Sequence, residues 1–107
     1  MKESEFNTQV DELMLAIEET IDESGADLDY ETSSGVMTLT VEANGSKVII
    51  SRQPALGQVW IAAKSGGYHC DYVGSEWVCG STGEILTVLL SRVLAEQFPV
   101  GTEPLEF

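Results

Sequence analysis

Acidic side chains are concentrated in one short stretch of the chain. Half of residues 18–31 are acids, namely Glu18, Glu19, Asp22, Glu23, Asp27, Asp29 and Glu31. No Lys or Arg occurs between Glu3 and Ser46 to balance them. Carboxylate oxygens suit hard or borderline cations such as Ca²⁺, Mn²⁺, Fe²⁺ and Fe³⁺. The stretch is therefore a candidate surface for a cation or a basic protein, with a solvated acidic face as the alternative.

Carboxylates at these positions cost stability. Glu18/Asp22 and Glu19/Glu23 are like-charge pairs one helical turn apart, and each pair is unfavourable by roughly 0.2–0.5 kcal/mol. Both pairs approach the C-terminus of an expected helix, where the helix dipole already disfavours negative charge. A purely structural helix would place Lys or Arg there, so the cluster favours a role for the charge itself.

The composition predicts one acidic domain spanning residues 1–107. The chain has a formal net charge of −13 and 43% hydrophobic residues, enough for a single core. The charge argues against binding to nucleic acid or to an anionic membrane, because both would repel it. The N-terminal segment lacks the pattern of a signal peptide, and no apolar stretch is long enough to span a membrane. We therefore expect a cytoplasmic protein with reduced cysteines.

Few residues could support catalysis. The one histidine, His69, is followed by Asp71 on the same strand face, a pair more typical of a surface than of a nucleophilic site. Spacings for glycine-rich phosphate loops and EF-hands are missing. Cys70, Cys79 and His69 are one ligand short of a zinc site. We expect no catalytic residues and no enzymatic activity.

The acidic stretch begins on a predicted helix. Apolar residues recur every three or four positions, the spacing of one helical face, at Phe6, Val10, Leu13, Met14, Ile17 and Ile21. Ser4 is the expected N-cap, and Ser24-Gly25 is the expected end of the helix. The acids occupy the opposite, outward face of this helix.

The acidic stretch continues on a predicted strand. Asp27, Asp29 and Glu31 alternate with Leu28 and Tyr30, which is typical of a half-buried strand. If this strand is a sheet edge beside the helix, the acids of both elements form one ridge. Charge on an edge strand also opposes association between sheet edges.

Further strands are expected at residues 36–42, 46–52, 58–64, 68–73 and 77–79, with a hairpin at Asn44-Gly45. Within 58–64, Val59 and Ile61 share one face and Trp60 takes the other, beside Gln58. An indole on the solvent side suggests a contact surface. The alternative places Trp60 in the core and Val59 outside.

The two cysteines fall on the last pair of strands. A two-residue turn at Gly74-Ser75 would set Cys70 opposite Cys79 on the core face, as buried thiols or, alternatively, as a cross-strand disulfide. Residues 81–84 have the pattern of a capping box, so a second helix is expected to begin near Thr82. The tail through Leu105 and Phe107 is expected to cover a gap between the helices.

The order of elements is helix, five or six antiparallel strands, helix. Packing both apolar helical faces on one side of a single sheet predicts an α+β two-layer sandwich whose other sheet face is open.

Several motifs together closely resemble the frataxin family, in its bacterial CyaY branch, over essentially the whole chain. They are Ile17-Glu18-Glu19, Asn44-Gly45-Ser46-Lys47, Arg52-Gln53, Gln58-Val59-Trp60, Gly66-Gly67-Tyr68-His69 and Glu76-Trp77. The resemblance implies the same sandwich. It also implies a cytoplasmic iron-binding protein, monomeric without iron, that regulates iron–sulfur cluster assembly by binding the cysteine desulfurase and contacting the scaffold protein. The alternative is an iron storage or detoxification protein that oligomerises with iron.

By position, the resemblance assigns weak surface binding of Fe²⁺ or Fe³⁺ to Glu18, Glu19, Asp22, Glu23, Asp27, Asp29 and Glu31. It assigns desulfurase docking to the same ridge, centred on Glu18, Glu19 and Asp22, and scaffold contact to Gln53, Gln58 and Trp60. Three positions depart from the family pattern: Asn7 and Gly57 replace possible histidines, and Cys70 replaces a usual aromatic residue.

Overall fold

The first helix forms where the apolar periodicity predicts it. The computed structural model describes all residues from Met1 to Phe107. Helix α1 (Glu3–Ser24) buries Phe6, Val10, Met14, Ile17 and Ile21 and ends at Gly25, whose φ of 69° suits glycine. The prediction of Ser4 as N-cap was wrong. The amide of Phe6 donates to the carbonyl of Lys2 at 2.9 Å, so the N-cap is Lys2, two residues earlier than expected, and Ser4 lies inside the helix.

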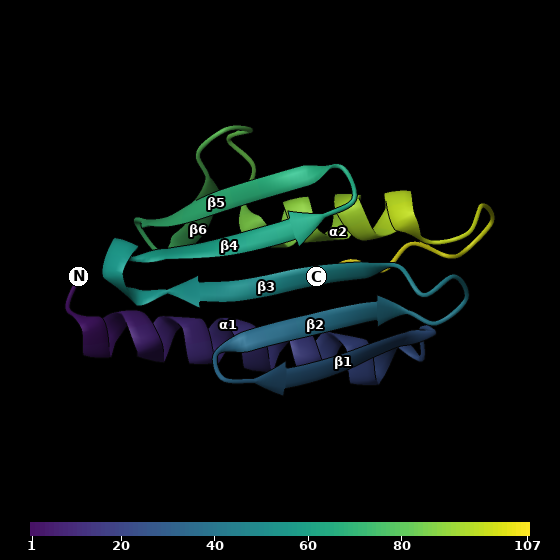
Figure 1. Ribbon diagram of the computed structural model, residues 1–107, viewed down its shortest axis with the longest axis horizontal. Helices are drawn as coiled ribbons and strands as arrows, with labels where there is room; N and C mark the ends of the chain where they lie inside the picture. Colours follow the sequence, from purple (N-terminus) through teal and green to yellow (C-terminus); the bar gives the residue numbers. More distant parts are fainter.

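Six strands form one antiparallel sheet in chain order, without a crossover. They are β1 (Leu28–Ser33), β2 (Val36–Val41), β3 (Lys47–Gln53), β4 (Gln58–Ala63), β5 (Gly66–Val73) and β6 (Glu76–Cys79). A short 3₁₀ helix, η1 (Pro54–Leu56), joins β3 to β4. Strands β1 and β6 are therefore the two edges of the sheet, as Figure 1 shows.

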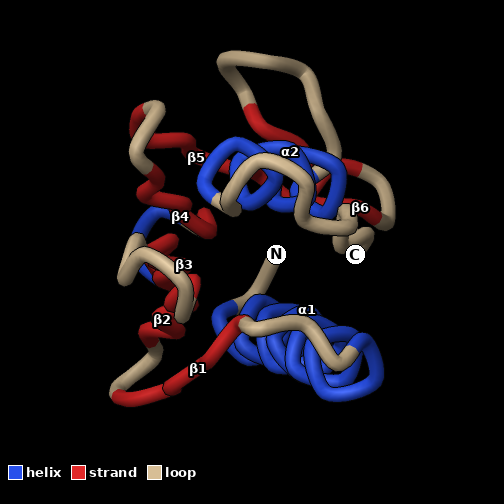
Figure 2. The backbone as a smooth tube through the Cα atoms, turned by 90° about the vertical axis from the view of Figure 1, so that its right-hand side faces the viewer, coloured by secondary structure: helices blue, strands red, loops and turns tan.

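Both helices cover the same face of this sheet. Figure 2 shows α1 and α2 (Leu86–Gln97) on one side and no further element on the other. The predicted two-layer α+β sandwich with an open sheet face is confirmed. The chain returns between the helices, where Leu105 is buried and the amide of Phe107 donates to Oγ of Ser91 at 3.0 Å. None of the helices is long and apolar enough to cross a membrane.

The hairpin between β2 and β3 is confirmed, but its loop is longer than a two-residue Asn-Gly turn. The amide of Val41 donates to the carbonyl of Ser46, which leaves residues 42–45 in the loop. The side chain of Asn44 accepts a hydrogen bond from the Ser46 amide and donates to the carbonyl of Gln97 at 2.7 Å. The loop is therefore shaped by its link to the end of α2.

The second helix begins later than the capping-box pattern predicts. It starts at Leu86 and has no side-chain cap, so the predicted start near Thr82 was wrong. The carbonyl of Glu84 accepts a hydrogen bond from the Cys79 amide, and Val78 pairs with Ile85 as a β-bridge. Residues just before the helix thus continue the sheet edge, and this pairing delays the first helical turn.

Candidate binding surfaces

The helical acids lie on the last two turns of α1, facing away from its buried stripe. Glu19, Asp22 and Glu23 are exposed, whereas Glu18 is half-buried. Their position follows from the helical period, because Ile17 and Ile21 of the same turns pack in the core.

Strand β1 holds two of these carboxylates in place. The hydroxyl of Tyr30 donates to both carboxylate oxygens of Asp22, each at 3.0 Å. The hydroxyl of Thr32 donates to Oε2 of Glu18 at 3.2 Å. The pKa of Tyr30 is raised, first by its hydrogen bond to Asp22 and further by burial and the surrounding carboxylates. These hydrogen bonds link the last turns of α1 to the edge strand β1.

The strand acids point to the other side of β1. Leu28 is buried and Tyr30 packs against the core, so Asp29 and Glu31 occupy the opposite face by the two-residue period. Asp27 precedes the strand and is exposed. The expected ridge is therefore folded over the edge strand instead of lying on one face. We call this surface the acidic edge: Glu18, Glu19, Asp22, Glu23, Asp27, Asp29 and Glu31.

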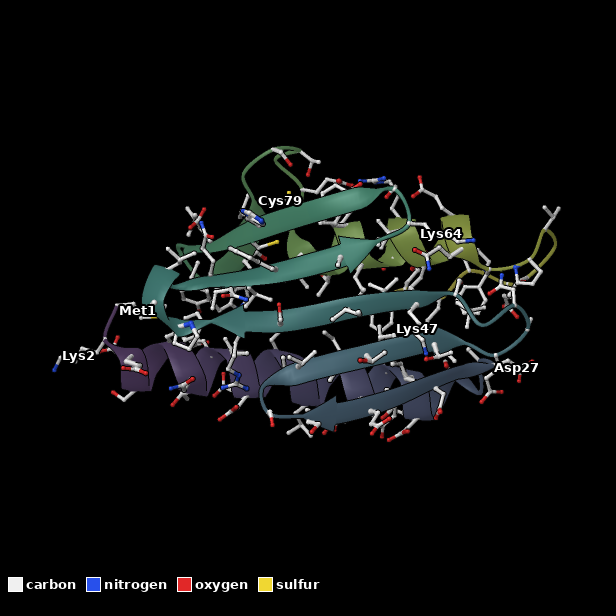
Figure 3. The ribbon with its side chains drawn as sticks, in the orientation of Figure 1. Met1, Lys2, Asp27, Lys47, Lys64 and Cys79 are labelled. Atoms are coloured by element: carbon white, nitrogen blue, oxygen red, sulfur yellow. The ribbon has the colours of Figure 1, made fainter.

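No cation of the protein neutralises the acidic edge. The ion pairs join Arg52 to Asp11 at 2.6 Å and Arg92 to Glu84 and Glu96 at 2.8 and 3.4 Å. Figure 3 shows oxygen-ended side chains along the side formed by α1 and β1, with Asp27 at one end. The carboxylates have the chemistry that hard cations prefer, yet no three His, Cys, Asp or Glu side chains converge as a ready-made metal site. The surface therefore fits loosely held cations or a complementary basic surface.

A second candidate surface lies on the open sheet face. Trp60 is half-buried there, while Val59 and Ile61 are buried beneath it, so the predicted orientation of the indole is confirmed. Nε1 of Trp60 donates to Oε1 of Gln58 at 2.8 Å, and Nε2 of Gln58 donates to Oδ1 of Asp71 at 3.1 Å. These bonds fix the indole against the sheet.

Two residues of this surface were missed by sequence reasoning. The ring of His69 stacks on Trp60 with centroids 4.1 Å apart, and Asp71 holds Gln58. Both positions follow from the register of β4 and β5, which pairs Trp60 with His69 and Gln58 with Asp71. The Gly66-Gly67 pair marks a turn in the sequence, but the pairing of Ala63 with Gly66 that sets this register is given only by the structure.

Gln53 completes the same surface. It pairs with Gln58 across β3 and β4, and its Nε2 donates to Oγ of Ser51 at 3.4 Å. We call the group Gln53, Gln58, Trp60, His69 and Asp71 the tryptophan patch. A shallow polar hollow of about 280 Å³ adjoins it, lined by Gln58, Gly67, His69, Asp71, Gly80 and Ser81.

Comparison with known proteins identifies the family. Residues 1–100 match the family model described as a frataxin-like domain. The chain belongs to the frataxin family.

Relatives of this frataxin agree with its fold. It is 51% identical over 90 residues to the iron–sulfur cluster assembly protein CyaY of Vibrio cholerae, which covers 83% of this chain and 86% of that protein. The solved frataxin of Psychromonas ingrahamii matches with a TM-score of 0.90 at 39% identity, covering 99% of this chain and 97% of that one. Trimeric frataxin from Saccharomyces cerevisiae, complexed with ferrous iron, matches with a TM-score of 0.66 at 32% identity, covering 90% and 85%.

The three departures from the family pattern have structural roles. Oδ1 of Asn7 accepts a hydrogen bond from Nη1 of Arg52 at 3.0 Å, which ties α1 to β3. Gly57 ends η1 with a φ of 64°, a conformation that favours glycine over histidine. Cys70 is buried on β5 directly opposite Cys79.

Proposed function

We propose that this frataxin is an iron-responsive regulator of iron–sulfur cluster assembly that docks on a cysteine desulfurase through its acidic edge. The observation that carries the proposal is a set of seven carboxylates around β1 without a single ion-pair partner. Such a surface attracts a basic protein surface over a distance and speeds its encounter. The Vibrio cholerae relative, an iron–sulfur cluster assembly protein, supports this setting.

Iron binds weakly along the same acidic edge. The yeast relative was solved with ferrous iron, and the carboxylates here have suitable chemistry without forming a cage. Bound iron would neutralise part of the charge that attracts the desulfurase. Iron and desulfurase binding are therefore coupled, because both draw on the same carboxylates.

The tryptophan patch serves as the contact for the scaffold protein. An aromatic ring fixed by hydrogen bonds and surrounded by amide groups has the character of an interface centre. The acids Asp29 and Glu31 share the open sheet face with it. One molecule could therefore engage the desulfurase and the scaffold on adjoining surfaces.

The proposed role is binding and not catalysis, and its place is the cytoplasm. His69 lies against Trp60 with no nucleophile hydrogen-bonded to it, and both cysteines are buried. The residues that carry the proposal are therefore ligands and contacts, not a reacting group.

Charge reversal on the acidic edge tests the proposal. A variant with Glu18→Lys, Glu19→Lys and Asp22→Lys should bind a purified bacterial cysteine desulfurase about tenfold or more weakly than the wild type at low salt. The matched control carries Glu3→Lys, Glu5→Lys and Glu12→Lys, three reversals on α1 outside the acidic edge, and should lose much less affinity. Equal affinity of wild type and edge variant at low salt would refute docking through this surface.

Light scattering during aerobic Fe²⁺ addition separates the alternative role. The alternative is iron storage or detoxification by a protein that oligomerises with iron, and it is considered because the yeast relative is a trimer solved with ferrous iron. Growth into large assemblies with iron would support storage, whereas a chain that stays monomeric at high iron ratios supports regulation.

A further inference from the structure

The two cysteines face each other across the last two strands. Cys70 on β5 and Cys79 on β6 are register partners, and neither side chain is accessible to solvent. Both are free thiols on the core face of the sheet.

The backbone pattern makes the two cysteines a non-hydrogen-bonded pair. The amide of Gly80 donates to the carbonyl of His69, which places the ladder bonds one residue away on each strand. The amide of Cys79 turns outward and donates to the carbonyl of Glu84. Residues in such pairs have Cα atoms about 4.5 Å apart, which lies within the range that a disulfide spans. A bond between the two sulfurs therefore requires little backbone movement.

We propose that Cys70 and Cys79 form a reversible disulfide that links the edge strand β6 to β5. The oxidant is a small disulfide of the glutathione type, which is reduced as the bond between the two cysteines forms. Because the bond joins neighbouring strands already in register, it adds a restraint without changing the fold.

Cys79 is the attacking group. It lies at the end of β6 beside exposed Gly80 and Ser81, so opening of this four-residue edge strand uncovers it first. Burial alone would raise the pKa of Cys79, but hydrogen bonds with Ser81 and Thr82 outweigh it and leave the pKa below its usual value. Burial, followed by the charge of Cys79, raises the pKa of Cys70 to about 12.

The exchange balances in two steps. The Cys79 thiolate attacks one sulfur of glutathione disulfide, which forms a mixed disulfide and releases one glutathione thiolate that takes up a proton. Cys70 then loses its proton and attacks Sγ of Cys79, which releases the second glutathione. The two cysteine thiols are oxidised to one disulfide, and one glutathione disulfide is reduced to two thiols.

The disulfide would lie on the core face of the sheet and would restrain the strands that carry the tryptophan patch on the open face. His69 and Gly80 are the neighbours of Cys70 and Cys79, and both line the hollow on the open face. A fixed β5–β6 spacing therefore fixes the strand that presents His69 to Trp60. This link to scaffold contact rests on the proposed function, whereas disulfide formation does not.

The test uses the isolated full chain in glutathione redox buffers. After each incubation, remaining thiols are blocked with an alkylating reagent and counted by mass spectrometry. Both thiols should disappear together, without a lasting glutathione adduct and without dimers on a non-reducing gel. The oxidised chain should melt about 5–10 °C higher than the reduced chain, because a short loop is closed in the unfolded state.

Two single variants identify the chemistry. In Cys70→Ala, Cys79 should retain glutathione as a stable adduct, since no second thiol can release it. In Cys79→Ala, Cys70 should stay reduced under the same native conditions. Persistence of both wild-type thiols at the most oxidising ratio, even in mild urea that opens β6, would overturn the proposal. Disulfides formed only between chains would overturn it as well. Because no desulfurase or scaffold is present, failure here leaves the proposed function untouched.

Discussion

The acidic edge and the α2 side of the molecule differ in whether their carboxylates have ion-pair partners. On the α2 side, Arg92 donates to both carboxylate oxygens of Glu84, at 2.8 and 3.0 Å, and also pairs with Glu96. The same guanidinium lies over the ring of Tyr68, 5.9 Å from its centroid. On the acidic edge, seven carboxylates share no cation. The ion pairs of Arg92 stabilise the fold, whereas the unpaired carboxylates of the acidic edge are available to bind a partner.

The same contrast holds for buried polar groups. Gln97, at the end of α2, is buried, and its side chain makes three hydrogen bonds. Its Oε1 accepts from the amide of Lys64, and its Nε2 donates to Oγ of Ser46 and the carbonyl of Lys47. The carboxylates of the acidic edge instead make only the hydroxyl bonds from Tyr30 and Thr32. Substitutions should therefore reduce stability on one side and binding on the other.

The largest loss of stability is expected from Gln97→Ala. Removing the side chain leaves an amide, a carbonyl and a hydroxyl without their partner, and we expect a loss of about 2–3 kcal/mol in the free energy of unfolding. Urea denaturation measures this value. Glu19→Gln on the acidic edge is the control and should lose nothing. A Gln97→Ala variant as stable as the wild type would mean that water replaces the network without cost.

A smaller, pH-dependent loss is expected from Arg92→Leu. The hydrogen bonds from Arg92 hold the pKa of Glu84 below its usual value, against the opposing effect of burial. A lowered folded-state pKa contributes stability above the unfolded pKa of Glu, about 4.3, and that stability is lost as pH falls through the folded value. The variant should melt a few degrees below the wild type at neutral pH, because the pair is partly exposed.

Melting curves over a pH series check this prediction. The gap between wild type and Arg92→Leu should close as the pH is lowered into the acid range. A Glu96→Gln variant is the control, since Glu96 makes the longer and more exposed contact with Arg92. A gap that stays constant with pH would assign the loss to packing on Tyr68 instead of to charge.

The layer architecture was predictable because it depends on local periodicity. The apolar stripe of α1 and the alternation in the strands set the buried faces, and Tyr30 and Trp60 lie on the predicted sides. Helix starts were less predictable because tertiary contacts compete for the same groups. Glu84 reaches Arg92 eight residues later instead of capping α2, and its carbonyl serves the Cys79 amide.

The candidate surfaces were predictable in composition but not in shape. The run of acids was evident, whereas its division across the two sides of β1 depends on which face of the edge strand meets α1. His69 looked like an ordinary surface residue because its stacking partner, Trp60, is nine residues away on another strand. The register of the β4–β5 hairpin places His69 beside Trp60. The alternation within a single strand does not specify which residue of the next strand lies opposite.

The smallest effect should come from relieving repulsion on the acidic edge. Glu19 and Glu23 are a like-charge pair on α1 whose carboxylates receive no bond from β1, so Glu23→Gln should raise the free energy of unfolding by about 0.2–0.5 kcal/mol. Asp22→Asn should gain less, because Asp22 also accepts the Tyr30 hydroxyl at 3.0 Å and a neutral amide weakens that bond.

Sodium chloride should raise the melting temperature of the wild type by screening, and millimolar Ca²⁺ by ligation, each more than in Glu23→Gln. Melting curves across a salt series measure both effects. A flat response in the wild type would mean that the carboxylates are too far apart to repel, and the acidic edge would then differ from the α2 side only in lacking a cation and not in stored repulsion.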